Sequence, residues 1–394
     1  MALPPGEPMT LFFLIGGMIF LLLAAHPFTT YPLSLLLLKR WRGRPLQPAA
    51  RTQPYRYAVC VAAYNEAAVI RRKAENLVAL RQKLGDAELL VYVDGASDDT
   101  AKILSEFAPD IDVVVSPKRS GKSAGMNALL ARTTADIVIF TDANAIIDID
   151  GIAALKGYFD DPKVGCVCGH LVYSGDADFS QTAQVGSAYW RLEEHIKQLE
   201  SDTGSAMGAD GALFAIRREL YRPVREDVID DMFTSISILC DGYRVVRAEE
   251  FRAWEPPTTQ SDEEFRRKVR ISCRAFNAHR LLWKRLHGLD GVTKYKYLSH
   301  KLLRWFSGMN LMIAALFAWA LLASLIGVWI SLGLAAVTMS ALTFLYASGA
   351  RPIRLIGEIV FALIAASFGV VKSLQGERFQ TWTPPASTRK PGSP

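Results

Sequence analysis

The spacing of apolar residues divides the chain into two membrane-length runs and a long middle region. The first run, 9–38, has 30 residues and no charged side chain unless His26 is protonated. The second, 308–350, has 43 residues and no charged side chain. A bilayer core of about 30 Å needs about 20 apolar helical residues, so the first run predicts one transmembrane helix and the second predicts two. The region between them has the composition of a globular domain, which excludes a pure transporter bundle.

Strand and helix patterns alternate after a proline- and arginine-bearing linker, 39–54. Short β-branched runs predict strands, and apolar residues every three or four positions predict helices. The predicted order is strand 57–62, helix 66–81, strand 89–93, helix 98–107, strand 111–115, helix 123–131 and strand 137–141. Less regular patterns follow, with strands at 164–173, 212–217 and 243–248 and helices at 181–200, 231–239 and 262–283. The alternation predicts an α/β fold in which ligands bind at the carboxyl ends of parallel strands.

Charge sets the expected orientation of the membrane segments. Four basic residues, Lys39, Arg40, Arg42 and Arg44, follow the first run, and no lysine or arginine precedes it. A cleaved signal peptide needs a basic stretch before its apolar core, so an uncleaved anchor is the preferred interpretation. The positive-inside rule then predicts an outer N-terminus and a cytosolic middle region. The five cysteines, an odd number, do not indicate a disulfide framework.

A second concentration of charge precedes the long apolar run. Residues 266–304 contain twelve lysines and arginines but only one acidic residue, Asp290, within a chain of formal net charge +6. Nucleic acid is one partner for such a stretch. The adjacent apolar run favours a cytosolic membrane surface instead. A further apolar stretch, 359–371, is short enough to be either a third C-terminal span or an interfacial helix, and the tail from Thr383 is expected to be disordered.

Polar turns follow each of the first four predicted strands. They are listed here in chain order: Ala63-Tyr64-Asn65-Glu66, Asp94-Gly95-Ala96-Ser97-Asp98-Asp99, Gly121-Lys122 and Asp142-Ala143-Asn144. These turns are expected at one edge of the sheet, where carboxylates, a lysine and glycines suit a nucleotide diphosphate with a divalent cation. The alternative is a membrane-tethered P-loop NTPase built on Ser120-Gly121-Lys122-Ser123, but the P-loop pattern needs glycine at position 116, which is Ser116.

Together these motifs resemble the membrane-integrated family 2 glycosyltransferases of GT-A fold, which include the cellulose, hyaluronan and poly-N-acetylglucosamine synthases and shorter exopolysaccharide relatives. The resemblance covers about 57–305 and the flanking membrane helices. Its other pieces are Gly211-Ala212 before Ala215-Ile216-Arg217-Arg218, Asp230-Asp231, and Arg266-Arg267-Lys268-Val269-Arg270. It implies a GT-A-type, Rossmann-like mixed sheet flanked by helices, with transmembrane helices at both ends.

The resemblance also implies a role for each matching residue. Tyr64 and Glu66 would border the nucleoside, and Asp94 would bind the base or ribose. Lys122 would lie along the nucleotide, while Asp142 would hold Mg²⁺ or Mn²⁺ bridging the diphosphate. Asp231 matches the general base. Arg267 and Arg270 lie in the element whose arginine holds the diphosphate, whereas Arg280, Lys284 and Arg285 are expected on a solvated or lipid-facing surface.

Two departures from the family pattern limit these expectations. The metal motif is Asp-x-Asn, so metal contact depends mainly on Asp142. The Gln-x-x-Arg-Trp element of the polymer synthases keeps Arg270 but has Ile271 in place of tryptophan. Since that tryptophan helps to hold the acceptor sugar, processive synthesis is the less favoured alternative.

The sequence therefore predicts an inverting glycosyltransferase (a hexosyltransferase of the EC 2.4 class) in the inner cell membrane. It would move sugar from a nucleotide-sugar, preferably a UDP-sugar, to a lipid-linked or growing glycan at the cytosolic face, in exopolysaccharide or cell-surface glycan synthesis. No nucleic-acid partner is expected. The predicted organisation is an anchor at 1–38, a linker at 39–54, a GT-A catalytic domain at 55–290, a basic interfacial segment at 291–306, membrane helices at 307–372 and a tail at 373–394. A non-catalytic membrane scaffold remains an alternative.

Overall fold

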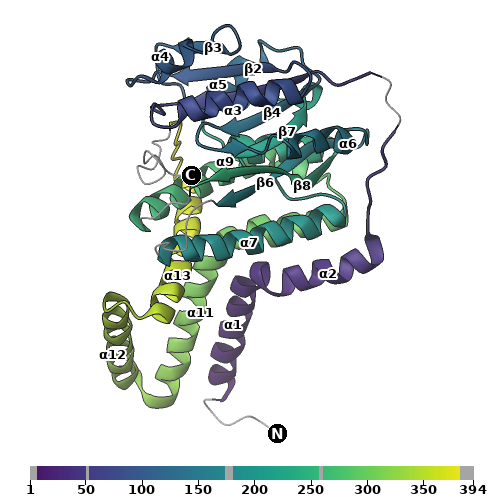
Figure 1. Cartoon of the computed structure of the whole chain (residues 1–394). Helices are drawn as coiled ribbons and strands as arrows, with labels where there is room; N and C mark the ends of the chain where they lie inside the picture. The colour runs from purple at the N-terminus through teal and green to yellow at the C-terminus, as the bar shows by residue number, and fades with distance from the viewer. Residues whose placement is uncertain (1–6, 50–52, 174–180, 257–260, 382–394) are drawn as a thin grey trace.

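The computed structural model describes residues 7–49, 53–173, 181–256 and 261–381. Figure 1 shows a sheet-containing domain at the top, the helices α2 and α7 beneath it, and a group of helices that extends away from the domain toward the N-terminus. The prediction of a disordered tail from Thr383 lies outside the described residues.

An eight-stranded mixed sheet forms the centre of the upper domain, in the order β3-β2-β1-β4-β7-β6-β8-β5. Strands β1 to β4 are mutually parallel, whereas β7 is antiparallel to both of its neighbours, β4 and β6. The strands are β1 (Tyr57–Ala63), β2 (Glu88–Asp94), β3 (Asp112–Ser116), β4 (Ile137–Asp142), β5 (Ile146–Ile147), β6 (Val164–Tyr173), β7 (Leu213–Arg217) and β8 (Arg244–Glu255). The predicted mixed α/β architecture is confirmed.

Helices cover both faces of this sheet because its inner strands are apolar on both sides. The helices of the domain are α3 (Ile70–Lys83), α4 (Thr100–Ser105), α5 (Lys122–Leu130), α6 (Leu155–Phe159), α7 (Gln181–Asp202), α8 (Asp230–Cys240) and α9 (Ser261–Leu286). In β1, Val59 and Val61 face one core with α3, while Ala58 and Cys60 face a second core with α5, α8 and α9. This alternation follows from the two-residue period of a strand.

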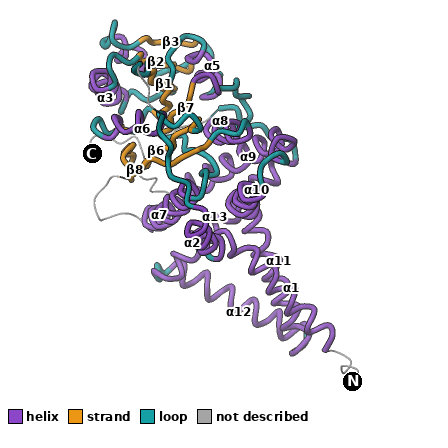
Figure 2. The backbone as a smooth tube through the Cα atoms, turned by 90° about the vertical axis from the view of Figure 1, so that its right-hand side faces the viewer, coloured by secondary structure: helices purple, strands orange, loops and turns teal. Residues whose placement is uncertain are grey.

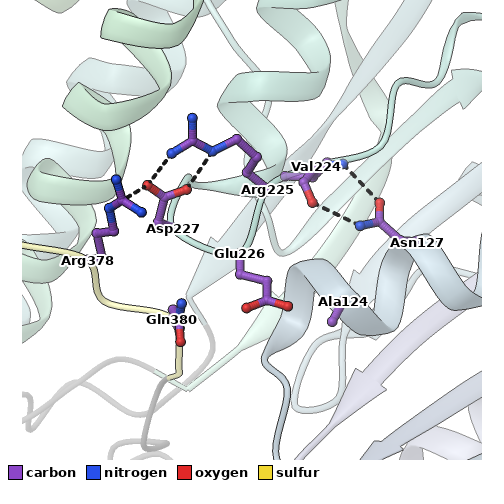
Figure 3. A pocket seen from close by; sticks show the side chains of 8 residues that line it. All are labelled: Ala124, Asn127, Val224, Arg225, Glu226, Asp227, Arg378 and Gln380. Atoms are coloured by element: carbon purple, nitrogen blue, oxygen red, sulfur yellow. Dashed lines mark hydrogen bonds and ion pairs between the residues drawn. The ribbon is translucent and has the colours of Figure 1, made fainter.

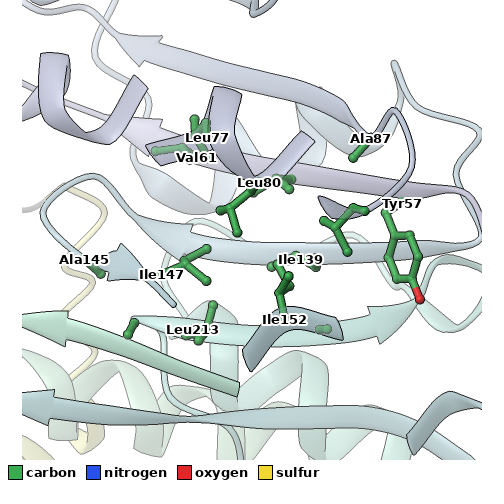
Figure 4. Close-up of a cluster of buried hydrophobic side chains, with 14 of the residues drawn as sticks. Tyr57, Val61, Leu77, Leu80, Ala87, Ile139, Ala145, Ile147, Ile152 and Leu213 are labelled. Atoms are coloured by element: carbon green, nitrogen blue, oxygen red, sulfur yellow. The ribbon is translucent and has the colours of Figure 1, made fainter. Parts of the chain in front are cut away.

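The first core holds β1, β2 and β4 in register beneath α3. Leu77 and Leu80 of α3 pack toward Val61 and Ile139, and all four side chains are fully buried (Figure 4). Each such aliphatic side chain contributes about 1.5–3 kcal/mol when removed from water. This packing fixes the strand ends, and with them the turns that carry the polar residues.

The N-terminal apolar run is divided into two helices rather than one. Helix α1 (Glu7–Ala25) belongs to a stretch, Pro8–Phe28, that is long and apolar enough to cross a membrane. A 3-10 turn with Pro27 near its start ends it, and α2 (Thr30–Arg42) follows at an angle along the underside of the domain (Figure 1). Tyr31 and Leu35 of α2 pack in one cluster with residues of α7. The apolar residues beyond Phe28 thus help to attach the domain.

The C-terminal apolar run forms two helices, as predicted. Helix α10 (Gly291–Tyr297) leads through a π-helical stretch (Leu298–Leu302) into α11 (Leu303–Ile326), and α12 (Val328–Ala347) follows after Gly327. Gly327 has φ +88°, a conformation that glycine adopts without strain. Helix α13 (Arg351–Leu374) is the last helix of the described residues (Figure 2). Among those residues, α1, α11, α12 and α13 each have the length and composition of a membrane span.

Helix α13 ends on the side of the sheet-containing domain, which limits how many of these helices cross the membrane fully. It runs antiparallel to α11, because Ser367 contacts Trp305 while Leu363 lies against Gly308. Its last turns pack on α9, where the carbonyl oxygen of Ser373 accepts a hydrogen bond from Arg280. Four complete crossings would put this end across the membrane from the domain. The contacts with α9 therefore favour an interfacial or partly inserted α13.

Candidate active site

The polar turns meet at one edge of the sheet, as the parallel strands require. Strands β1, β2, β3 and β4 run in the same direction, and their carboxyl ends lie at Ala63, Asp94, Ser116 and Asp142. The turn after β3 is fastened to the end of β2, since Asp94 accepts hydrogen bonds from the backbone N–H groups of Ser120 (2.6 Å) and Gly121 (2.8 Å). The edge is a single surface rather than four separate loops.

Lys122 joins carboxylates from two distant parts of the chain. Its Nζ lies 2.7 Å from Asp142 Oδ1 at the end of β4 and 3.3 Å from Asp230 Oδ2 at the start of α8. It also donates to the carbonyl oxygen of Gly211 at 3.2 Å. Although burial opposes its charge, these neighbouring carboxylates raise the pKa of Lys122 well above its usual value. The lysine is therefore the positive centre of an acidic cluster.

The two adjacent aspartates have different environments. Asp230 is only 3% exposed and faces Lys122, whereas Asp231 is partly exposed. Burial, followed by the charge of Asp230, raises the pKa of Asp231 to about 7. Asp210, which lies in the turn before β7 and is another candidate for a base, forms an ion pair with the buried Lys197. A partly exposed carboxylate with a pKa near neutrality has the properties of a general base, so the environment favours Asp231.

Helix α9 brings two arginines to the site in different states. Arg267 forms an ion pair with Glu264 (3.4 Å), and this neighbouring carboxylate keeps its pKa raised despite burial. Arg270, one turn away, makes no hydrogen bond or ion pair within the described residues. Burial, then the charges of Arg274 and Arg267, lowers its pKa to about 10. A largely buried guanidinium without a protein anion is suited to an anionic ligand.

The predicted nucleoside residues form a separate group at the ends of β1 and β2. The guanidinium of Arg119 lies 3.8 Å from the ring centroid of Tyr64, a cation–π distance. Glu66 is 2% exposed, and its backbone N–H donates to Thr100. Asp94 is fully buried beneath the turn that it holds. The structure therefore exposes Tyr64 and Arg119 at this end, with Glu66 and Asp94 behind them.

Only one protein carboxylate is available in the metal motif. Asp142 is about one-third exposed at its side chain, whereas Asn144 is buried and donates to Glu255 at 2.8 Å. Among the described residues no group of three or more histidines, cysteines, aspartates or glutamates could hold a metal by itself. The oxygens around Lys122 nevertheless show that this position attracts a cation. The donor set fits a divalent ion that takes its other ligands from a bound diphosphate and water.

A family model described as glycosyl transferase family 2 matches residues 58–225. This segment contains the strand-end turns, Lys122, Asp142 and the Gly211 carbonyl. Residues 58–225 therefore resemble a family 2 glycosyltransferase domain, and the domain that contains them is called the transferase domain below. The finding does not support the P-loop alternative for 120–123, and it accords with a lysine that contacts carboxylates at the edge of the sheet.

The chain has relatives with different stated activities. It is 36% identical over 115 residues to the β-monoglucosyldiacylglycerol synthase of Trichormus variabilis, which covers 28% of this chain and 25% of that protein. It is 24% identical over 248 residues to an N-acetylglucosaminyltransferase of Rhizobium sp., covering 59% of this chain and 55% of that protein. The chain thus spans between about a quarter and about half the length of these curated relatives.

A solved structure resembles nearly the whole chain. The mannosyltransferase PcManGT from Pyrobaculum calidifontis, in complex with GDP-Man and Mn²⁺, has a TM-score of 0.67 and 23% identity, covering 92% of this chain and all of that one. At this identity the likeness establishes the fold. The transferase domain therefore has the GT-A-type architecture predicted from its motifs.

Sequence reasoning missed two functional candidates in the transferase domain. Lys73 of α3 is fully buried beneath the metal motif, and its Nζ donates to Thr141 Oγ1 (3.0 Å) and the Ala145 carbonyl (2.5 Å). Arg119 was not singled out either, although it lies over Tyr64. The signal for Lys73 was its place in the apolar stripe of α3, one turn after Ile70, where a surface lysine is not expected.

Three basic residues in the last turns of α9 were expected on a surface. Arg280 and Lys284 are exposed, although Arg280 also donates to the Ser373 carbonyl of α13 (2.9 Å). Arg285 is partly buried and forms an ion pair with Asp241 at the end of α8 (2.6 Å). Arg280 and Arg285 therefore also connect helices of the protein.

A polar cavity of about 720 Å³ lies beside α5, outside the acidic cluster (Figure 3). Asn127 fixes one wall through paired hydrogen bonds with the backbone of Val224. Arg378 and Gln380, which follow α13, form part of the opposite wall, and the carbonyl oxygen of Gln380 reaches the turn at Gly121. The C-terminal segment thus lies against the turn that follows β3, at the edge of the sheet that carries the polar turns.

Proposed function

We propose that this chain is a membrane-anchored inverting glycosyltransferase that uses a nucleotide-sugar, preferably a UDP-sugar. One observation carries the proposal. Lys122, Asp142 and Arg270, which has no ion-pair partner among the described residues, lie near the carboxyl ends of parallel strands, close to Asp231, whose pKa is raised to about 7. This arrangement supports a role for the cations in binding a leaving diphosphate and for Asp231 as the base for an incoming hydroxyl.

Each group has a defined part in the proposed reaction. Asp231 accepts the proton of the acceptor hydroxyl as that oxygen attacks the anomeric carbon of the donor. The glycosidic bond to the diphosphate breaks, and Arg270 and Lys122 stabilise the negative charge that develops on the leaving group. A single base and direct displacement invert the configuration, so an α-linked donor gives a β-linked product. Tyr64 and Arg119 contact the nucleoside end of the donor.

A divalent cation, Mg²⁺ or Mn²⁺, is the proposed cofactor, and Asp142 is the residue that would hold it. When bound, it supplies additional positive charge to the diphosphate. Glu66, Asp94 and Arg267 are assigned to the donor site as supporting residues, because their side chains are buried or paired behind the exposed groups.

The proposed acceptor is a lipid-linked or growing glycan at the cytosolic face of the inner membrane. The position of the membrane helices next to α7 and α9 supports an acceptor that approaches from the bilayer. One relative is named as a glucosyldiacylglycerol synthase and another as an N-acetylglucosaminyltransferase, which is compatible with either kind of acceptor. Processive synthesis remains the alternative, disfavoured by Ile271 at the position of the acceptor-binding tryptophan.

The decisive experiment is a donor screen on membranes that contain the full-length protein. Radiolabelled UDP-glucose, UDP-N-acetylglucosamine and GDP-mannose are each supplied, and lipid-extractable and polymeric products are identified by mass. We expect transfer from one UDP-sugar, loss of transfer on chelation, and loss in Asp231→Asn. Hydrolysis of ATP without transfer of any sugar would contradict the proposal, and a long polymer would support the processive alternative.

A further inference from the structure

The ammonium group of Lys122 occupies a cage of protein oxygens. Asp142 Oδ1, the Gly211 carbonyl and Asp230 Oδ2 lie 2.7, 3.2 and 3.3 Å from its Nζ. Asp231 adds a third carboxylate whose charge also acts on the lysine. Three carboxylates in a mostly buried site need a counter-charge, and within the described residues Lys122 is the cation in direct contact with two of them.

A divalent ion at Asp142 would compete for the same carboxylate. Asp142 is the one carboxylate of the metal motif, and its oxygen is already paired with Lys122 at 2.7 Å. Two cations that share one carboxylate repel each other strongly in a site of low dielectric constant. Metal binding at Asp142 is therefore opposed for as long as the ammonium stays in place.

The two ends of the ion-pair network differ in how freely they can rearrange. Lys122 is the first residue of α5 and has a long flexible side chain. The side chain of Asp142 is about one-third exposed. Asp230, in contrast, is only 5% exposed at its side chain and has no second cation in contact with it among the described residues. Lys122 can leave Asp142 by rotating its side chain, and Asp230 remains to hold it.

We propose that Lys122 is an exchangeable counter-ion, which neutralises Asp142 in the donor-free enzyme and gives Asp142 up to a divalent cation that arrives with the nucleotide-sugar. In this arrangement the donor-free protein binds metal weakly. The metal enters together with the diphosphate, whose own negative charge compensates for the second cation. This inference rests on the proposed function for the identity of the ligand, and it adds an order of binding.

The test measures binding of Mn²⁺ alone to the purified full-length protein, from the loss of the electron paramagnetic resonance signal of free Mn²⁺. Lys122→Met and Lys122→Gln should each lower the apparent Kd for Mn²⁺ by at least about tenfold, because the competing charge is gone. Lys118→Met is the matched control. It removes an exposed charge from the same loop and should change the Kd by less than about twofold.

Two further variants locate the site. Asp142→Asn should weaken Mn²⁺ binding, and the double change Lys122→Met with Asp142→Asn should remove the gain. Equal or weaker Mn²⁺ binding in both Lys122 variants would overturn the proposal, as would a gain that survives loss of Asp142. The Mn²⁺ binding measurement contains no sugar donor, so its result can be interpreted even if the donor screen finds no transfer. If the donor screen finds sugar transfer but the Lys122 variants do not bind Mn²⁺ more tightly, the proposed function stands and the exchange of Lys122 for a metal ion is wrong.

Discussion

At the scale of single residues, two adjacent aspartates have separate tasks because of where α8 begins. Asp230 and Asp231 occupy its first turn, and successive helical side chains point about 100° apart. Asp230 is buried and lies 3.3 Å from Lys122, while Asp231 is partly exposed. We therefore expect Asp230 to pair with charge and Asp231 to meet the acceptor.

Asp231→Asn should leave donor binding nearly unchanged and lower kcat by about 10²–10⁴-fold, the usual effect of losing a general base. The asparagine keeps the shape and hydrogen-bonding capacity of the residue but cannot take a proton. Asp230→Asn is the matched comparison and should cost less turnover. Donor binding is measured separately by calorimetry. A larger loss of kcat in Asp230→Asn would assign the base to Asp230.

The raised pKa of Asp231 predicts the pH dependence of turnover. Burial and Asp230 raise this pKa to about 7, so the carboxyl group is protonated below that pH and ionised above it. Since a base acts in its ionised form, kcat should rise with pH and level off above about pH 7 to 8. The profile is measured at saturating donor and metal. A kcat that is flat between pH 5.5 and about 8 would separate Asp231 from the rate-limiting proton transfer.

The sequence predicted that the polar turns after β1 to β4 lie at one edge of the sheet. It could not predict which side chains contact one another at that edge. Local periodicity predicts the parallel strands, and these strands put Asp142 at the same edge of the sheet as the other polar turns. The pairing of Lys122 with Asp230 joins residues more than a hundred positions apart, and no local pattern records it. Lys73 was missed for a related reason, because its partners are a hydroxyl and a backbone carbonyl on another element.

At the scale of secondary-structure elements, α9 connects the transferase domain to the membrane part. Its beginning carries Arg267 and Arg270 to the site, and its middle packs against the last turns of α13. Periodicity predicted this helix to within a few residues at each end. It could not predict that α13 would pack along α9 near Val269 and Cys273, since that depends on how the chain returns from the membrane.

Arg270→Ala should lower kcat by about 10²–10³-fold, as expected when one preorganised donor to a developing negative charge is removed. Lys284→Ala is the control, because Lys284 lies on the same helix but is exposed. It should change kcat by less than about twofold. Both are compared at saturating donor to separate turnover from binding. Similar losses from the two changes would mean that α9 acts only through its total charge.

The return of α13 predicts which loops share a side of the membrane. Ala49→Cys before the domain and Gln375→Cys after α13 should react with an impermeant maleimide from the same side, which we expect to be the cytosol. Trp329→Cys, at the turn between α11 and α12, should react from the opposite side. Sealed vesicles of known orientation provide the measurement. If Gln375→Cys reacted from the same side as Trp329→Cys, α13 would cross the membrane completely.

At the scale of the whole molecule, the apolar runs and the transferase domain form one connected structure. Helix α2 attaches under α7 through Tyr31 and Leu35, and a buried network ties the same region to α11. In that network His300 lies between Glu193 and Glu200, and Tyr31 also contacts Glu200. Hydropathy predicted that both apolar runs are helical, but not that the first divides into α1 and α2. The attachments depend on residues that look unremarkable in the sequence.

The packing of α13 on α9 has a consequence for preparing the protein. Gly369 lies so close to α9 that a Cβ on it would meet the Val269 carbonyl at 2.5 Å, so the two helices are in direct backbone contact. A fragment cut after Leu286 would leave this face of α9 uncovered in water. We expect such a fragment to be insoluble in water, while the full chain stays in solution in detergent. The membrane helices then stabilise the fold of the sheet-containing domain. Crystallisation and activity assays should therefore use protein that contains both parts.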